Sequence, residues 1–210
     1  MKNYIPIHMI KEWMWCPRSF YYKVFIRNEP KTESMKYPKY DKKWLEGKIR
    51  KLKLQGTLLL EYPVRSSRLG IIGCVDAIIL QDSYFYIVEV KLNITKSMVK
   101  RGKAKHIALQ VMAYVIAAEE TLHKVCKEAY IIGLEKDSII KIKPLLTYKL
   151  MLIDVVEEIW SYIKSGELPP RTRDKRKCMC CYFNSCLLYT SSEPTRPRLI
   201  SYAVFCLKKK

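Results

Sequence analysis

Two acidic residues and a lysine lie on neighbouring segments that are expected to be extended strands. Glu89-Val90-Lys91 ends one apolar run, and Asp76 lies inside the apolar run that precedes it. Alternate residues of a strand face the same side, so Glu89 and Lys91 should project together. A short turn-like segment between the two runs predicts a hairpin, which would bring Asp76 to a comparable depth. The spacing therefore predicts two carboxylates and an ammonium group at one point of a sheet.

This combination of groups suits phosphodiester hydrolysis. Carboxylate oxygens are ligands that Mg²⁺ or Mn²⁺ prefers, and such an ion can polarise a phosphate and lower the pKa of a water. Lys91 could position that water or stabilise negative charge on the phosphate. A bare Glu-x-Lys is also a common surface salt bridge. Gln110 and Tyr114, four residues apart on one face of the next expected helix, add further context.

The remaining hydrophobic pattern predicts an α/β protein with a mixed sheet. A helix over 7–28 should bend at Cys16-Pro17, because proline removes a backbone donor and disfavours helix in the residue before it. Residues 29–41 are polar and predict a loop. Apolar periodicity predicts the other helices over 42–54, 103–121 and 148–164, and the strands over 58–64, 71–80, 84–91, 129–134 and 138–142.

The chain is strongly basic. Its 210 residues carry 39 Lys and Arg against 20 Asp and Glu, a net charge of +19, which favours nucleic acid as a partner over an anionic membrane. No apolar run is long enough to span a bilayer, and the N-terminus lacks the apolar stretch of a signal peptide. We therefore expect a cytoplasmic protein that does not bind membranes.

Several of the 8 cysteines are clustered, and in a reducing compartment such clusters indicate metal binding more often than disulfides. Cys178 and Cys181 lie near the C-terminus with Cys180 between them, and Cys16 lies far away in the sequence. Thiolates around iron or zinc need to converge only in space. A zinc knot and simple reduced thiols remain alternatives. Two further cysteines in apolar contexts, Cys74 and Cys126, are expected to be buried.

Three motifs in this order resemble the RecB-like family of PD-(D/E)xK nucleases: Gly73-x-x-Asp76, Glu89-Val90-Lys91 and Gln110-x-x-x-Tyr114. The resemblance implies a restriction-endonuclease-like fold. It also implies that Asp76, Glu89 and the backbone carbonyl of Val90 bind the metal, and that Lys91 acts in catalysis. Gln110 and Tyr114 would support the site or the DNA.

One feature departs from that family. Its members carry an additional metal-binding histidine shortly before the first strand, where this chain has Glu46-Gly47-Lys48-Ile49-Arg50-Lys51. The site could use a different ligand such as Glu46, bind metal more weakly, or be inactive. An inactive site would leave a nuclease-like DNA-binding protein.

The segment Cys16-Pro17-Arg18-Ser19-Phe20-Tyr21-Tyr22, followed by a late cysteine cluster, resembles the CRISPR-associated RecB-like exonucleases of the Cas-four family. The resemblance implies a structural four-iron four-sulfur cluster, with zinc as the alternative, on Cys16, Cys178, Cys181 and Cys186. It implies a DNA exonuclease that acts on single-stranded ends during CRISPR spacer acquisition, with integrase proteins as partners. A viral or mobile-element repair nuclease is a close variant, and a zinc-dependent nucleic-acid adaptor is a more distant one.

Basic and aromatic residues near the expected cluster could contact single-stranded DNA. The candidates are Arg18, Tyr21, Tyr22, Arg171 and Arg173. A solvated linker is the alternative explanation of the basic run around Arg171.

The sequence predicts four segments: an N-terminal helical segment (1–35), a nuclease core (36–168), a cysteine segment (169–186) and a tail (187–210). The tail resembles the translation of a transposon-based sequencing adapter, beginning near Cys186 and ending in a run of lysines. We therefore expect the tail to be non-native and the natural C-terminus to be missing.

Overall fold

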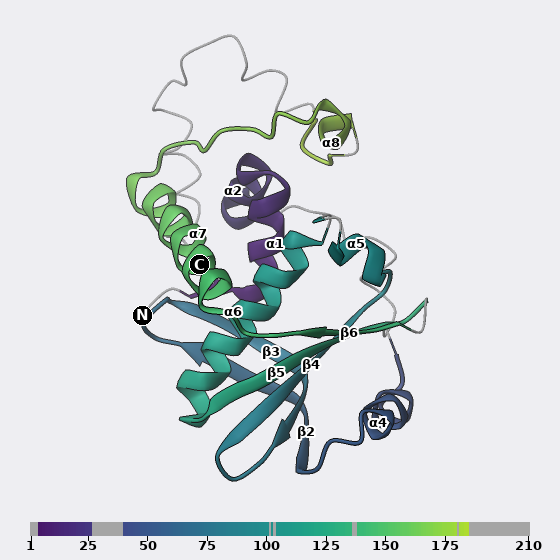
Figure 1. Ribbon diagram of the computed structural model, residues 1–210. Helices are drawn as coiled ribbons and strands as arrows, with labels where there is room; N and C mark the ends of the chain where they lie inside the picture. The colour runs from purple at the N-terminus through teal and green to yellow at the C-terminus, as the bar shows by residue number, and fades with distance from the viewer. Residues whose placement is uncertain are drawn as a thin grey trace. The chain divides into compact units, whose positions relative to one another are not determined.

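The computed structural model divides the chain into two compact units. Unit 1 comprises Met1–Lys11 and Glu33–Glu157, and unit 2 comprises Glu12–Thr32 and Glu158–Lys210. The structure describes residues 4–26, 40–100, 102, 104–135, 138–179 and 181–184 (Figure 1).

Unit 1 holds a mixed sheet and most of the helices. Its strands are β1 (Ile5–Pro6), β2 (Thr57–Ser66), β3 (Ile71–Leu80), β4 (Tyr84–Lys91), β5 (Val125–Gly133) and β6 (Ser138–Ile142). Its helices are α4 (Lys42–Lys51), α5 (Lys96–Lys100) and α6 (Lys105–Leu122), together with the start of α1 (Ile7–Trp15) and most of α7 (Leu146–Ser165). This arrangement confirms the predicted α/β class with a mixed sheet flanked by helices.

The order of the strands explains where a site can form. In the six-stranded sheet of the described residues, β2 lies along one edge of β3, antiparallel to it. The other edge of β3 is shared: β1 pairs with Ile71 and Ile72, and β4 pairs with Ala77 through Leu80. On this edge, residues 73–76 of β3 therefore lie between the part of β3 that pairs with β1 and the part that pairs with β4. The antiparallel pairing of β3 with β4 confirms the predicted hairpin.

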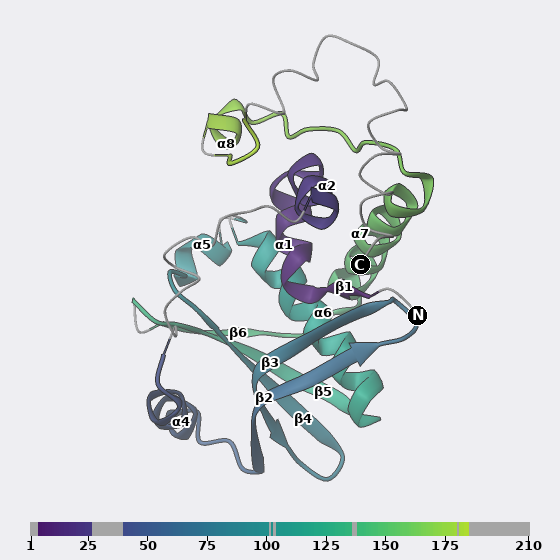
Figure 2. The same cartoon turned by 180° about the vertical axis from the view of Figure 1, so that it is seen from behind.

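Each face of the sheet is covered by a helix (Figures 1 and 2). On one face, Leu45 and Ile49 of α4 pack in a core cluster with Val88 and Val90 of β4. Side chains alternate along a strand, so Ile87 and Glu89 face the opposite side, where α6 contacts β2, β3, β4 and β5. Burying an apolar side chain of this size stabilises the fold by about 1.5–3 kcal/mol.

The predicted helices and strands agree with the structure in the described residues, apart from some of their ends, whereas residues 29–39 of the predicted loop lie outside the described residues. Proline divides the first predicted helix as expected, into α1 and α2 (Pro17–Ile26). The short elements β1, α5 and α8 (Lys175–Met179) were not predicted, because two to five residues carry too little periodicity. The expectation for Cys74 was wrong: its side chain is exposed, whereas Cys126 is buried as predicted.

Unit 2 is built from the two ends of the chain. It contains α2, the last turn of α1, the end of α7, and α8. Trp13 of α1 packs edge-on against Phe20 of α2, with ring centroids 5.3 Å apart, and its indole N–H donates to Glu158 of α7. The hydroxyl of Tyr21 donates to the carbonyl of Gly166 over 3.1 Å. None of the helices among the described residues is both long enough and apolar enough to cross a membrane.

Candidate active site

Asp76 lies where β3 and β4 separate. The last pair between the two strands is Ala77 with Val88, so Glu89 and Val90 lie beyond the ladder. The side chain of Asp76 replaces the missing backbone acceptor, since its Oδ2 accepts a hydrogen bond of 2.7 Å from the N–H of Val90. The N–H and C=O of one strand residue point to the same side. The carbonyl of Val90 is therefore directed to the side on which Asp76 lies.

Glu89 brings a second carboxylate to this point. Its side chain is buried, and Lys91 donates a hydrogen bond of 2.7 Å to its Oε1. Its Oε2 is also buried and has no hydrogen-bond partner. Burial raises the pKa of Glu89 to about 7, Lys91 opposes that rise and the Asp76 carboxylate adds to it. A buried carboxylate oxygen without a partner is costly, so this atom is suited to a cation or a proton.

Gln110 and Tyr114 of α6 lie beside the carboxylates. Desolvation raises the pKa of the Tyr114 hydroxyl, the charges of Glu89 and Asp76 add to this rise, and the nearby side chain of Gln110 opposes it. Gln110 Oε1 is buried without a partner. The motif residues of β3, β4 and α6 thus come together as expected from their order in the sequence.

Gly73 makes room for Tyr114. A Cβ at this position would lie 2.8 Å from Cε1 of Tyr114 and 3.1 Å from Cβ of Ile7. Real Cβ atoms do not approach ring carbons so closely, so a larger residue would push the tyrosine away. The contact with Tyr114 therefore gives a steric explanation for a glycine at the first position of the Gly-x-x-Asp motif.

The donor set fits a hard divalent cation. Asp76 and Glu89 provide carboxylate oxygens, and the carbonyl of Val90 provides a third oxygen on the same side. Carbonyl and water oxygens complete the coordination of Mg²⁺ or Mn²⁺ in many proteins. Across the part of the chain that the structure describes, no three His, Cys, Asp or Glu side chains form a group that could hold a metal. The cation would thus depend on the two carboxylates and on main-chain oxygen.

Three residues of this neighbourhood were not predicted. The hydroxyl of Tyr40 donates a 2.5 Å hydrogen bond to Oδ1 of Asp76, and Lys42 forms an ion pair of 2.8 Å with Glu61 of β2. Burial and the Asp76 carboxylate raise the pKa of Tyr40 well above its usual value. Tyr40 lies just before α4 and Lys42 is its first residue. Both are far from Asp76 in sequence, and no short motif joins them to it.

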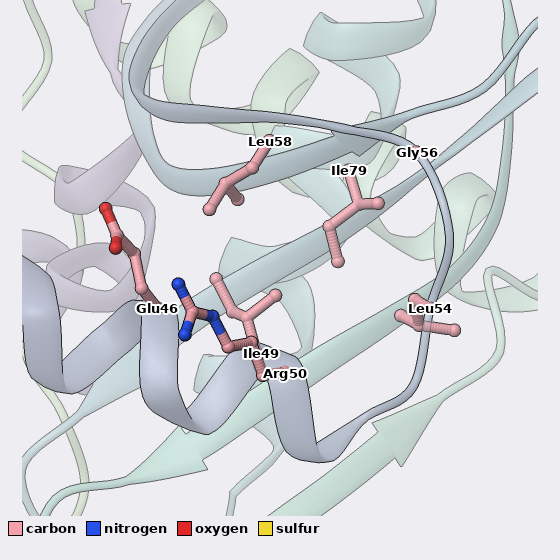
Figure 3. A pocket seen from close by; sticks show the side chains of 7 residues that line it. All are labelled: Glu46, Ile49, Arg50, Leu54, Gly56, Leu58 and Ile79. Atoms are coloured by element: carbon pink, nitrogen blue, oxygen red, sulfur yellow. The ribbon is translucent and has the colours of Figure 1, made fainter.

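Glu46, the alternative metal ligand, lies elsewhere. It lines a pocket of about 230 Å³ together with Arg50 of the same helix and with Leu58 and Ile79 of the sheet (Figure 3). It does not form a metal-binding group with Asp76 and Glu89, all three of which are described. The structure therefore does not support Glu46 in the place of the family histidine.

Three of the four predicted cluster cysteines lie in unit 2. Cys16 is buried directly before α2, and its Sγ accepts a 3.4 Å hydrogen bond from the N–H of Thr172. Cys178 lies in α8, and the turn after it places Cys181 with its Sγ 3.9 Å from the hydroxyl of Ser19. The three side chains are free thiols. Thiolates are suitable ligands of iron or zinc, but these three described cysteines do not by themselves form a group that could hold a metal.

The remaining predicted cluster residue, Cys186, lies outside the described residues, as do Cys180 and the tail 187–210. Cys74 lies in unit 1, near the carboxylates. Partial burial and the charges of Asp76, Glu61 and Glu89 raise the pKa of its thiol. The thiol of Cys126 has its pKa raised to about 12, chiefly by burial.

The predicted DNA-contact residues differ in their exposure to solvent. Arg171 and Arg173 are exposed. Arg18 Nε donates to the carbonyl of Pro169 over 2.9 Å, and Tyr21 is buried, so both stabilise unit 2 itself. Tyr22 is half-buried and packs against Phe183, with ring centroids 5.5 Å apart.

Two known proteins that are similar to this chain over most of its length carry the same name. The CRISPR-associated exonuclease Cas4 of Francisella tularensis subsp. novicida is 28% identical over 198 residues, which cover 87% of this chain and 93% of that protein. The CRISPR-associated exonuclease Cas4 of Aeropyrum pernix is 29% identical over 188 residues, which cover 85% of this chain and 92% of that protein. No protein-family model matches the sequence.

Solved structures share the fold. The crystal structure of the protein SSO0001 superposes with a TM-score of 0.54 at 18% identity and covers 93% of this chain and 89% of its own. A candidate exonuclease from Eubacterium rectale gives a TM-score of 0.51 at 13% identity, with 96% and 93% covered. The resemblance that the sequence motifs predicted is thus confirmed: this chain is a relative of the CRISPR-associated Cas4 proteins.

Proposed function

We propose that the protein is a metal-dependent DNA exonuclease that acts on single-stranded ends. The observation that carries this proposal is the buried carboxylate of Glu89, which has one oxygen bound to Lys91 and the other without a partner. Both relatives are named as exonucleases. The residues that match the motifs of RecB-like nucleases lie near one another on the mixed sheet and α6.

The residues have distinct roles in this proposal. Asp76, Glu89 and the carbonyl of Val90 would hold Mg²⁺ or Mn²⁺, and that ion would supply a more acidic water and a polarised phosphate. Lys91 would hold the attacking water and stabilise negative charge on the phosphate, because its ammonium group already lies against Glu89. Gln110 and Tyr114 would keep the Glu89 side of the site in place.

Single-stranded DNA fits the exposed side chains of unit 2. Arg171, Arg173 and Lys175 are exposed cations, and Trp15 and Tyr182 are exposed aromatic residues in the same unit. Bases stack on such rings while cations contact the phosphates. Tyr21 is left out of this surface because it is buried.

We further propose a four-iron four-sulfur cluster on Cys16, Cys178, Cys181 and Cys186, with zinc as the alternative. The support is that two ends of the chain contribute cysteines to the same compact unit. Such a group would join the start of α2 to the turn after α8, and its role would be structural.

The biological role proposed is the trimming of DNA ends during CRISPR spacer acquisition, together with integrase proteins. The relatives' names support a CRISPR-associated role. A second candidate is a DNA-binding protein that does not cleave, which the missing histidine between Glu46 and Lys51 favours.

The test is cleavage of end-labelled single-stranded DNA with Mn²⁺, using protein purified without oxygen. Wild type should release label, and Lys91→Ala should reduce the rate by about a hundredfold or more while DNA binding remains. Lys141→Ala is the matched control, since Lys141 also pairs with a glutamate, Glu128, on the same sheet. Equal rates for wild type and Lys91→Ala would refute the site. DNA binding without any cleavage would establish the second candidate.

A further inference from the structure

Helix α4 has a buried face and an exposed basic face. Leu45 and Ile49 are buried against the sheet. On the opposite side lie three exposed cations, Lys43, Arg50 and Lys51. An α-helix has about 3.6 residues per turn, so these cations project within a stripe about 100° wide, which we call the outer face of α4. In Figures 1 and 2, α4 lies at the margin of unit 1, and no other described helix or strand lies beyond it.

A glycine lies in the middle of this outer face. Gly47 is exposed, and a Cβ built on it would meet nothing within 4 Å. Glycine stabilises the interior of a helix less than alanine does, because it loses more backbone freedom on folding. Gly73 has a steric reason in Tyr114, whereas packing gives no such reason for Gly47. A bare helix backbone between cations does allow a ligand to approach closely.

The stability of the helix explains only part of the charge. Arg50 and Lys51 lie in the last turn, where cations interact favourably with the helix dipole. The same dipole disfavours a cation in the first turn, where Lys43 lies and acidic residues are absent. The neighbouring Lys42 is compensated by Glu61, at 2.8 Å. Lys43 forms no salt bridge with another described residue, so its charge remains available to a ligand.

The helix begins next to the candidate active site. Tyr40 lies two residues before α4, and its hydroxyl donates to Oδ1 of Asp76. The start of the helix is therefore within the reach of one side chain from the proposed catalytic carboxylate. A helix of 10 residues is about 15 Å long. Nucleotides of one DNA strand rise by about 3.4 Å each, so α4 can lie along about four of them.

We propose that the outer face of α4 binds the phosphodiester backbone of the DNA strand that leads to the candidate active site. Lys43, Arg50 and Lys51 contact the phosphates, and the strand comes closest to the helix at Gly47. The inference rests on the proposed function, because it takes DNA as the substrate. It adds a binding surface within unit 1 to the exposed cations and rings of unit 2. Contacts to phosphates carry no sequence information, so binding at this face should not depend on base sequence.

The experiment measures the affinity of the full chain for a fluorescently labelled single-stranded oligonucleotide by anisotropy, over a series of salt concentrations. EDTA is present, so that cleavage does not occur. The double variant Lys43→Gln/Lys51→Gln should bind about tenfold more weakly. The slope of log K against log salt should become shallower by about 1.4, because each phosphate contact on a single strand contributes about 0.7.

The matched control is Lys127→Gln/Lys143→Gln. It removes the same charge from two exposed lysines of unit 1 that lie outside α4. Its affinity should change by less than about twofold, with the same salt slope as wild type. Equal losses in the two double variants would show that binding reflects net charge alone, and would overturn the assignment to α4.

Gly47→Ala tests the close approach of the strand. The methyl group should weaken DNA binding about threefold, while the melting temperature rises because alanine favours the helix. These opposite directions separate a loss of binding from a loss of folding. An affinity of Gly47→Ala equal to that of wild type would refute Gly47 as the point of closest approach.

Further outcomes separate this proposal from the proposed function. If the α4 double variant binds as wild type does, while wild type cleaves and Lys91→Ala does not, the α4 surface is refuted and the nuclease stands. If wild type binds no DNA, the proposed function is itself wrong and the α4 surface falls with it. Loss of binding to vesicles of anionic phospholipid in the α4 double variant, with DNA affinity unchanged, would assign the surface to a membrane instead.

Discussion

The N–H of Val90 donates to Oδ2 of Asp76 across the point where two strands separate, with the two atoms 2.7 Å apart. The carboxylate of Asp76 thereby has two functions. It accepts the backbone hydrogen bond of Val90, and it is one of the oxygen ligands of the proposed cation site. Tyr40 holds the other oxygen of the same carboxylate. Stability and chemistry at this position can therefore be separated by the choice of substitution.

Asp76→Ala should lose both the hydrogen bond from the Val90 N–H and the negative charge that would bind a cation, whereas Asp76→Asn should lose only the charge. Alanine leaves the Val90 N–H without its acceptor, which should cost about 1–3 kcal/mol of unfolding free energy. Asparagine keeps an oxygen that can accept this bond but has no negative charge for a cation. Urea denaturation of metal-free protein should therefore rank wild type and Asp76→Asn together, above Asp76→Ala. Equal losses for the two variants would show that the hydrogen bond contributes little.

The stability of the metal-free protein should fall as the pH rises through neutrality. The pKa of Glu89 is raised to about 7 from an ordinary value of 4.5, so between these values the folded protein holds a proton that the unfolded chain has released. The contribution is fully present below about pH 4.5 and is lost as the pH passes about 7. Glu89→Gln lacks this loss and should melt at a higher temperature than wild type at about pH 8.

Addition of Mn²⁺ provides the control for that measurement. The ion should stabilise wild type at about pH 8 and leave the melting temperature of Glu89→Gln almost unchanged, since it binds the folded carboxylates. A wild-type melting temperature that is flat between about pH 5 and pH 8 would contradict the raised pKa of Glu89.

Gly73→Ala should disturb the site through Tyr114. The added Cβ would lie 2.8 Å from the ring, so the tyrosine or the strand must move, at a cost of about 1–3 kcal/mol. Gly47→Ala is the matched control, because a Cβ at Gly47 in α4 meets nothing within 4 Å. In that helix the change should stabilise the protein by about 1 kcal/mol. Thermal denaturation of the two variants should thus give shifts of opposite sign.

Cys16→Ala should remove the iron, and Cys126→Ala should not. Both thiols are buried, at 2% exposure each, so the loss of packing is similar in the two variants. Only Cys16 shares unit 2 with Cys178 and Cys181. Metal analysis and visible absorption of protein purified without oxygen measure the difference. Zinc in place of iron would favour the alternative group, and equal metal content in both variants would exclude Cys16 as a ligand.

Most of the sheet and the motif residues could be predicted from local pattern. The strands around Asp76 and Glu89 have long apolar runs with a turn between them, and α6 has a sustained helical period. The two-residue alternation of a strand was enough to predict that Glu89 and Lys91 project to the same side. In the structure, Nζ of Lys91 lies 2.7 Å from Oε1 of Glu89. The prediction for Cys74 was wrong because apolar neighbours in the sequence do not show whether that part of a sheet face is covered by other elements.

By itself, the sequence determined the α/β class, the proline break before α2, and the carboxylates and lysine that meet at the end of β4, since these follow from interactions between residues near one another in the chain. The contacts of Tyr40 and Glu61 were decided only by the tertiary structure. Tyr40 reaches Asp76 of β3, and Glu61 of β2 pairs with Lys42 at the start of α4. Such pairs join distant segments, and their partners are selected by how α4, β2 and β3 pack, which no local periodicity records.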